Sequence, residues 1–357
     1  MNNLAITYQH IADILSFESS NSKLEHTLSD PTFNWEAIVK EGSLHYVIPA
    51  IYCRLRSRQL LHVLPKDLIS YLDYITDENR QRNTIILAQI NELTDLLNSH
   101  NIEHTFLKGA ALLASGTYKD IAERMLGDID ILVHPEQLTT AFELLRDDGY
   151  QPKTMTLGHH FFEHKHLPRL ETKLTATRIA AVEVHRKLFV SYHYDALQPQ
   201  SIFKETRQIA SIYIPSQKHL LMHTILNHQI NDDGALYNSI TFRSAYDTIL
   251  LLQDYTEPNT WSNQKVFKKY FKYTSLFFNE IRKTKNVKPD IFSYFYLFKL
   301  KHIKFYRFWN KLLRLGAIIP ILLHRSWLFI SNKAYRKAII LDKNRIFTHF
   351  MSILRKN

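Results

Sequence analysis

The chain has 357 residues, 45% of them hydrophobic, and a single cysteine, Cys53. This composition excludes a disordered chain, an intramolecular disulfide and a zinc site built from cysteines. With 8 Gly and 11 Pro, it favours long helices over a sheet-rich fold with many tight turns. The N-terminal segment lacks an apolar signal region, so the sequence predicts a cytoplasmic protein.

Charge is unevenly distributed along the chain. The segment from Trp261 to Asn357 contains 22 Lys and Arg residues against three acids, a net charge of +19. Because the whole chain carries +11, the preceding residues carry −8. Two regions with different tasks are expected.

The first hundred residues follow a helical period. Leu4, Tyr8 and Ile11 share one helical face, and a similar period recurs further on. We therefore expect residues 1–100 to form an N-terminal helical region.

After residue 101 the sequence pattern changes from a continuous helical period to alternating strands and helices. The stretch IEHTFLKGAALLASGTY predicts a strand over 102–107, a turn at Lys108-Gly109 and then a helix. DIDILV (128–133) predicts a second strand, and QLTTAFELLRDDGY predicts a helix that ends at Gly149. AAVEVHRKL (180–188) alternates like another strand.

Acidic side chains stand on two of these predicted strands. Residues i and i+2 of a strand point to the same side, so Asp128 and Asp130 project together, and Glu183 can supply a third carboxylate. Solvated acids at a strand end are the alternative. Clustered carboxylates repel one another unless a cation lies between them, so the pattern favours a site for Mg²⁺ or Mn²⁺ formed by Asp128, Asp130 and Glu183.

The turn before the predicted helix suits phosphate binding. Lys108 and Gly109 precede a helix N-terminus, where backbone N–H groups and a cation can hold phosphates. Arg124, just before the second strand, can neutralise charge on the same group. These three residues are the predicted nucleotide-binding residues.

The arrangement FLKGAALL, RMLGDIDILV and VEVHRKL resembles the uncharacterised nucleotidyltransferase family of the polymerase-β-like nucleotidyltransferase superfamily. The resemblance implies that the turn binds nucleotide phosphates, that Asp128 and Asp130 bind Mg²⁺, and that Glu183 completes the site. It also implies transfer of an NMP group from an NTP, such as ATP, to a small acceptor. A sugar or phosphosugar in surface polysaccharide biosynthesis is the acceptor that the resemblance suggests.

The expected fold is α+β, with a small mixed sheet in the catalytic core (101–214). Helical regions flank this core, and the C-terminal one (215–357) carries a basic, aromatic tail from about residue 261. A solvated helical face, peripheral association with the inner face of a membrane, and nucleic-acid binding all suit this tail. Nucleic acid is the least favoured of the three.

Two rival functions remain open. One is a non-catalytic version of the fold, recruited to a membrane or partner by its tail, and the other is a nucleic-acid-directed nucleotidyltransferase.

Histidines cluster in the segment GHHFFEHKHLPRL, at positions 159, 160, 164 and 166. For this cluster a solvated or substrate-lining loop is favoured over a zinc site. Arg243 and Asp247 lie four residues apart on a predicted helix, where they are expected to pair.

Overall fold

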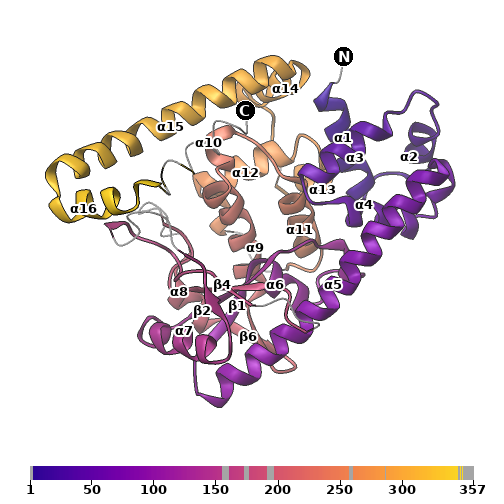
Figure 1. The fold of residues 1–357 in the computed structure, drawn as a ribbon. Helices are drawn as coiled ribbons and strands as arrows, with labels where there is room; N and C mark the ends of the chain where they lie inside the picture. Colours follow the sequence, from indigo (N-terminus) through magenta and orange to yellow (C-terminus); the bar gives the residue numbers. More distant parts are fainter. Residues whose placement is uncertain are drawn as a thin grey trace.

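A computed structural model describes residues 3–154, 161–172, 177–190, 197–256, 260–285 and 287–344, with residues 346 and 348. It is mostly helical, with one small mixed sheet, and so confirms the predicted α+β class. The helices before the first strand are α1 (Leu4–Leu15), α2 (Asn21–Leu28), α3 (Trp35–Leu44), α4 (Ile48–Ser57) and α5 (Lys66–Ser99). The long helix α5 runs past the sheet along one side of the molecule (Figure 1).

The sheet contains five strands among the described residues, in the order β1-β2-β5-β4-β3. Its central pair, β2 and β5, is parallel, and every other neighbouring pair is antiparallel. The first strand begins two residues later than predicted. The strands are β1 (His104–Leu107), β2 (Asp128–Val133), β3 (Gln151–Pro152), β4 (Leu170–Glu171) and β5 (Ala181–His185).

Short helices and a hairpin join the sheet to the second half of the chain. A separate antiparallel hairpin, β6 (Thr206–Ile209) and β7 (Ile212–Pro215), packs beside β1. Helix α9 (Gln217–Leu226) continues directly into a π-helical segment, Asn227–Asn231. The other helices of this part are α6 (Lys108–Ala114), α7 (Leu138–Asp147), α8 (Pro199–Lys204), α10 (Gly234–Tyr237) and α11 (Phe242–Gln253).

The beginning of the chain packs against helices of its last part, and the contacts of the segment that follows α1 with Glu280 on α13 are an example. The Ser16 hydroxyl and the Phe17 backbone N–H donate hydrogen bonds to Glu280 at 2.5 and 2.7 Å. The helices of this last part are α12 (Lys265–Thr274), α13 (Asn279–Lys285), α14 (Ile291–Lys301), α15 (Ile303–Ser331) and α16 (Lys333–Leu341).

Among the described helices, α15 alone combines enough length with enough apolar character to cross a membrane. It has 29 residues, and its most apolar stretch has a mean hydropathy of 1.4, which together would suffice to cross a membrane. None of that stretch is buried in the protein.

Candidate functional site

The two central strands place two acids side by side on one face of the sheet. Asp130 on β2 lies in register with Glu183 on β5. Asp128 precedes Asp130 by two residues and therefore points to the same side, whereas Ile129 and Ile131 are fully buried on the other face. Aspartate is tolerated in this strand because the neighbouring segments, strand β5 and the turn after β1, carry charged and polar groups that face it.

An imidazole joins the two acids. His185 Nε2 lies 2.7 Å from Asp130 Oδ1 and 3.5 Å from Glu183 Oε2. The ligand atoms of Asp130, Glu183 and His185 all lie within 4.8 Å of one another, so these three side chains can hold a metal ion. His185 and Asp130 are each 1% exposed, so this position is enclosed by the protein.

Lys108 supplies the positive charge nearest these acids. Leu107, the last residue of β1, lies in register with Asp130, so the turn that follows delivers the Lys108 ammonium directly to the Asp130 carboxylate. Lys108 itself has a left-handed backbone conformation, with φ of 50°. A residue with a side chain rarely adopts this conformation, so the surrounding structure holds the turn in place.

Gly109 allows a close approach at the start of α6. A Cβ atom there would lie 3.1 Å from Leu126 Cβ and 3.7 Å from Arg124 Nη2. A larger residue would push α6 away from residues 124–126, the segment that leads into β2.

Burial and neighbouring charge act in opposite directions on the acids. Burial alone would raise the pKa of Asp130, but the Lys108 charge and the His185 hydrogen bond outweigh it and hold that pKa well below its usual range. The pKa of Asp128 is raised, first by burial and then by repulsion from Asp130 and Glu183. Burial also tends to lower the pKa of Lys108, but Asp130 reverses the effect and raises it.

A second cation flanks the acids from the neighbouring strand. Arg169, just before β4, places Nη1 at 3.4 Å from Asp128 Oδ2 and at 3.9 Å from Glu183 Oε1. The three carboxylates therefore lie between Lys108 on one side and Arg169 on the other. These two cations offset part of the negative charge of the three carboxylates.

Amide side chains of α5 fix the segments that enter the two central strands. Asn83 Nδ2 donates to the carbonyl of Arg124 at 2.8 Å. Gln89 accepts from the backbone N–H of Ala180 at 3.0 Å and donates to the Ala180 carbonyl at 2.8 Å. Because these amides are buried, their bonds hold the approaches to β2 and β5 relative to one helix.

Arg124 does not lie against the acids of the sheet. Its Nε donates to Asp247 Oδ2 of α11 at 3.0 Å, and Tyr118 donates to the other oxygen of that carboxylate at 2.6 Å. The expected pair of Arg243 and Asp247 is wrong, because Asp247 pairs with Arg124 instead. Arg243 stacks over the Tyr46 ring, 5.2 Å from its centre.

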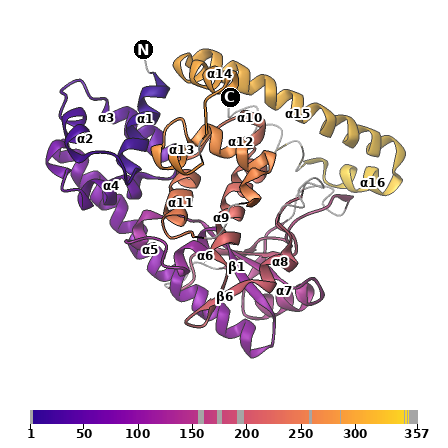
Figure 2. The same ribbon diagram turned by 180° about the vertical axis from the view of Figure 1, so that it is seen from behind.

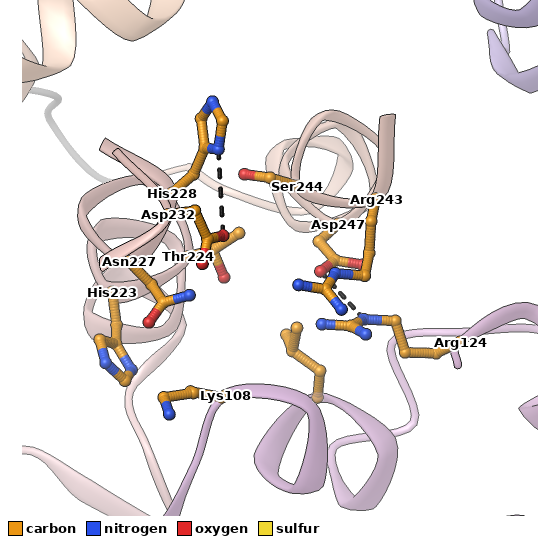
Figure 3. Close-up of a pocket in the computed structure, with 11 residues that line it drawn as sticks. Lys108, Arg124, His223, Thr224, Asn227, His228, Asp232, Arg243, Ser244 and Asp247 are labelled. Carbon is orange, nitrogen blue, oxygen red and sulfur yellow. Dashed lines mark hydrogen bonds and ion pairs between the residues drawn. The ribbon is translucent and has the colours of Figure 1, made fainter. Parts of the chain in front are cut away.

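A basic pocket opens beside Lys108, between the N-terminus of α6 and the helices α9 and α11 (Figure 3). Lys108 lies at its floor, His223 on one wall, and Arg124 and Arg243 on the other. The cavity has a volume of about 30 Å³, which is room for little more than a water molecule. A larger anion therefore enters only when the basic side chains separate.

Two buried imidazoles of this pocket each have a nitrogen without a hydrogen bond to any described residue. Within that part of the chain, His223 Nε2 has no hydrogen-bond partner, and His228 Nδ1 has only the Asp232 carboxylate, at 4.0 Å. Burial, followed by the nearby Lys108 charge, lowers the pKa of His223 to about 3. His223 is therefore neutral near pH 7 and can donate or accept a hydrogen bond toward a ligand.

The structure places the six predicted site residues in two groups. Lys108, Asp130 and Glu183 meet at the sheet, with Asp128 on the same side but outside the three-residue metal cluster. Arg124 reaches the basic pocket, and Gly109 starts the helix between the two groups. Their roles stay predictions.

Sequence reasoning missed several residues of the site. His185 lies on the predicted strand, two residues after Glu183, and that spacing alone was the signal that could have identified it. Arg169, His223 and Arg243 join the site through tertiary contacts that no local pattern indicates. They are brought to it by β4, α9 and α11.

The structure describes only part of the histidine cluster that the sequence singled out. His159 and His160 lie outside the described residues. His166 reaches the site: its Nε2 lies 3.7 Å from Glu183 Oε2, while its Nδ1 lies 2.7 Å from the Leu167 carbonyl oxygen. This places the end of the segment at the margin of the acids.

Comparison with known proteins adds a family to this geometry. The model of a family described as uncharacterised nucleotidyltransferase matches residues 31–268. No curated protein matches the chain. Among solved structures, the chain is similar to an antigenic nucleotidyltransferase-like protein from Paracoccidioides brasiliensis, at 14% identity and a TM-score of 0.39. That match covers 57% of this chain and 94% of the other.

Proposed function

The chain belongs to the uncharacterised nucleotidyltransferase family, and from this premise we propose that it transfers an NMP group from an NTP to a small acceptor. The observation that carries the proposal is the register of Asp130 with Glu183, directly beside the Lys108-Gly109 turn. The proposed acceptor is a sugar or phosphosugar, as the resemblance of the motifs implies, and its use in surface polysaccharide synthesis is part of the same proposal.

The donor atoms suit a divalent cation. Asp130 and Glu183 offer carboxylate oxygens, which Mg²⁺ and Mn²⁺ prefer, and His185 offers an imidazole nitrogen that suits Mn²⁺ better than Mg²⁺. The contact of the Lys108 ammonium with Asp130 is consistent with a cation site, because it shows that a positive charge is accommodated beside these acids. Asp130, Glu183 and His185 would hold the metal, with Asp128 beside them, and the bound metal would stabilise negative charge developing on the transferred phosphate.

The chain's own residues divide the remaining tasks. Lys108 leaves Asp130 and turns into the basic pocket, where it meets the triphosphate together with Arg124 and Arg243. The acceptor hydroxyl oxygen bonds to the α-phosphorus as the bond from that phosphorus to the bridging oxygen breaks. Pyrophosphate leaves, and Glu183 takes the hydroxyl proton.

Pyrophosphate release tests this proposal. The protein is incubated with each of the four NTPs, Mg²⁺ or Mn²⁺, and a panel of sugars and sugar phosphates. We expect metal-dependent release with one donor and one acceptor class. The variant carrying Asp130→Asn and Glu183→Gln should lose it by at least about 100-fold, the effect typical of removing a charge that stabilises a transition state.

Glu171→Gln is the matched control, because Glu171 is an exposed acid on β4 of the same sheet that pairs with Lys153. It should retain full activity. Release that survives in the double variant would contradict the proposed roles. NTP binding without turnover would instead favour the non-catalytic version of the fold.

A further inference from the structure

Helix α15 lies along an outer edge of the molecule, away from α5, in both views (Figures 1 and 2). None of its residues is buried. Leu323, Trp327 and Ile330 are 66%, 61% and 75% exposed. Soluble proteins rarely leave so many large apolar side chains uncovered on one element, so this helix is expected to have a partner.

Basic residues form one stripe along α15. Lys304, Arg307, Lys311 and Arg314 follow one another at spacings of three and four residues, which places them on one side of the helix. Arg325 continues the stripe about three turns later. The helix contains no acid, so nothing within it neutralises this charge.

An apolar stripe lies beside the basic one. Phe308, Leu312, Leu315, Ile319 and Leu323 share the neighbouring side of the helix, and all five are exposed. We propose that α15 docks this protein on the surface of an anionic lipid bilayer, with its apolar stripe in the acyl boundary and its basic stripe at the headgroups. Nucleic acid would satisfy the basic stripe alone and leave the apolar one in water.

Contacts at its two ends indicate that α15 lies on the membrane rather than crosses it. Near its start, Ile303 and Tyr306 pack against the core. Near its end, the Arg325 guanidinium lies 5.0 Å from the centre of the Phe162 ring, and Tyr335 of α16 is buried against Phe161. Because both ends rest on the same body, the helix does not deliver them to opposite sides of a bilayer.

Vesicle flotation of the full chain tests the proposal. One set of vesicles contains phosphatidylcholine alone, and the other contains phosphatidylcholine mixed with phosphatidylglycerol. We expect the protein to float with the anionic vesicles and to be released by alkaline carbonate. Tryptophan fluorescence should shift to the blue on binding, and Trp327→Phe should reduce that shift because Trp327 lies on the exposed helix.

Two variants separate the stripes. Lys311→Gln with Arg314→Gln should weaken anionic binding by roughly 25-fold, since each basic residue near such a surface contributes roughly fivefold. Leu315→Gln with Ile319→Gln should weaken it comparably. Lys23→Gln with Lys66→Gln is the matched control, because it removes the same charge from exposed positions on α2 and α5, and it should bind as the unchanged chain does. Circular dichroism of each variant verifies the fold.

Several outcomes would overturn the proposal. Vesicle binding that ignores lipid charge, or that only detergent reverses, would exclude surface docking of this kind. Absence of flotation, together with a dimer in sedimentation that the apolar variant dissociates, would assign the stripe to a second copy of the chain. Absence of flotation with salt-sensitive binding of a single-stranded RNA oligonucleotide would assign α15 to nucleic acid.

Discussion

The acids on the central strands of the sheet and the basic residues of helix α15 differ in whether opposite charges lie beside them. At the sheet, Lys108, Arg169 and His185 lie within 4 Å of acids, in a largely buried setting. On α15, the basic residues from Lys304 to Arg314 have no acid on their own helix and are exposed. In the first arrangement, protein cations offset part of the acidic charge, and the proposed function requires a metal and a nucleotide to take their place. The second is left unbalanced toward the outside, as a docking surface requires.

The largest expected effect concerns a buried charge. Asp247→Asn removes the ion-pair partner of Arg124, whose side chain is 10% exposed. Breaking a buried pair from one side lowers the free energy of unfolding by about 3–5 kcal/mol, measurable by urea denaturation. Asp77→Asn, which breaks the exposed pair with Arg80, should cost less than about 1 kcal/mol. Equal losses in the two variants would remove the distinction between buried and exposed charge.

Metal addition should give the next largest effect. A divalent ion at about 100 times its Kd stabilises the folded state by about 2.7 kcal/mol. Thermal unfolding with and without Mn²⁺ measures this gain. Glu183→Gln should abolish it, whereas the exposed control Glu171→Gln should preserve it. A gain that persists in Glu183→Gln would place the metal elsewhere.

Replacement of the imidazole in the cluster should affect turnover. His185→Gln retains a side chain able to hydrogen-bond to Asp130 but lacks the ring nitrogen that contacts both acids. Groups that orient or complete a metal site contribute about 10- to 100-fold, so kcat/KM should fall by that factor. His100→Gln, at the exposed C-terminal end of α5, is the control, and a comparable loss there would indicate a nonspecific effect.

The smallest effect on stability is expected on α15. Lys311→Gln with Arg314→Gln changes two exposed residues on a helix without buried side chains. Its free energy of unfolding should shift by less than about 0.5 kcal/mol, as read from urea denaturation. A loss of several kcal/mol would mean that this face packs within the protein instead of facing a partner.

Local patterns predicted the parts of the site that depend on neighbours in sequence. The two-residue spacing of Asp128 and Asp130 and the Lys108-Gly109 turn were recognisable because strand and turn geometry is short-ranged. The pair of Arg124 and Asp247 spans 123 residues, and no spacing rule connects them. Their contact depends on how α11 packs against α9 and how α9 packs against α6, which is decided by the tertiary structure.

Helix α15 illustrates the same limit from the other direction. Its longest uninterrupted apolar run, LGAIIPILL, is shorter than the roughly 20 residues that span a bilayer. The complete helix extends over 29 residues because the basic residues recur at helical spacing and interrupt the run without interrupting the helix. The sequence predicted a basic, aromatic tail, but its exposure on both stripes became visible only in the folded chain.

Calorimetric titration of NTP tests the central claim most directly, since it requires no acceptor. The titrations use the unchanged chain with Mg²⁺, the unchanged chain with EDTA, and Asp130→Asn with Mg²⁺. If the acids at the sheet hold the metal that accompanies the nucleotide, one NTP binds in the first titration, and binding weakens strongly in the other two. Equal binding in all three would contradict the account.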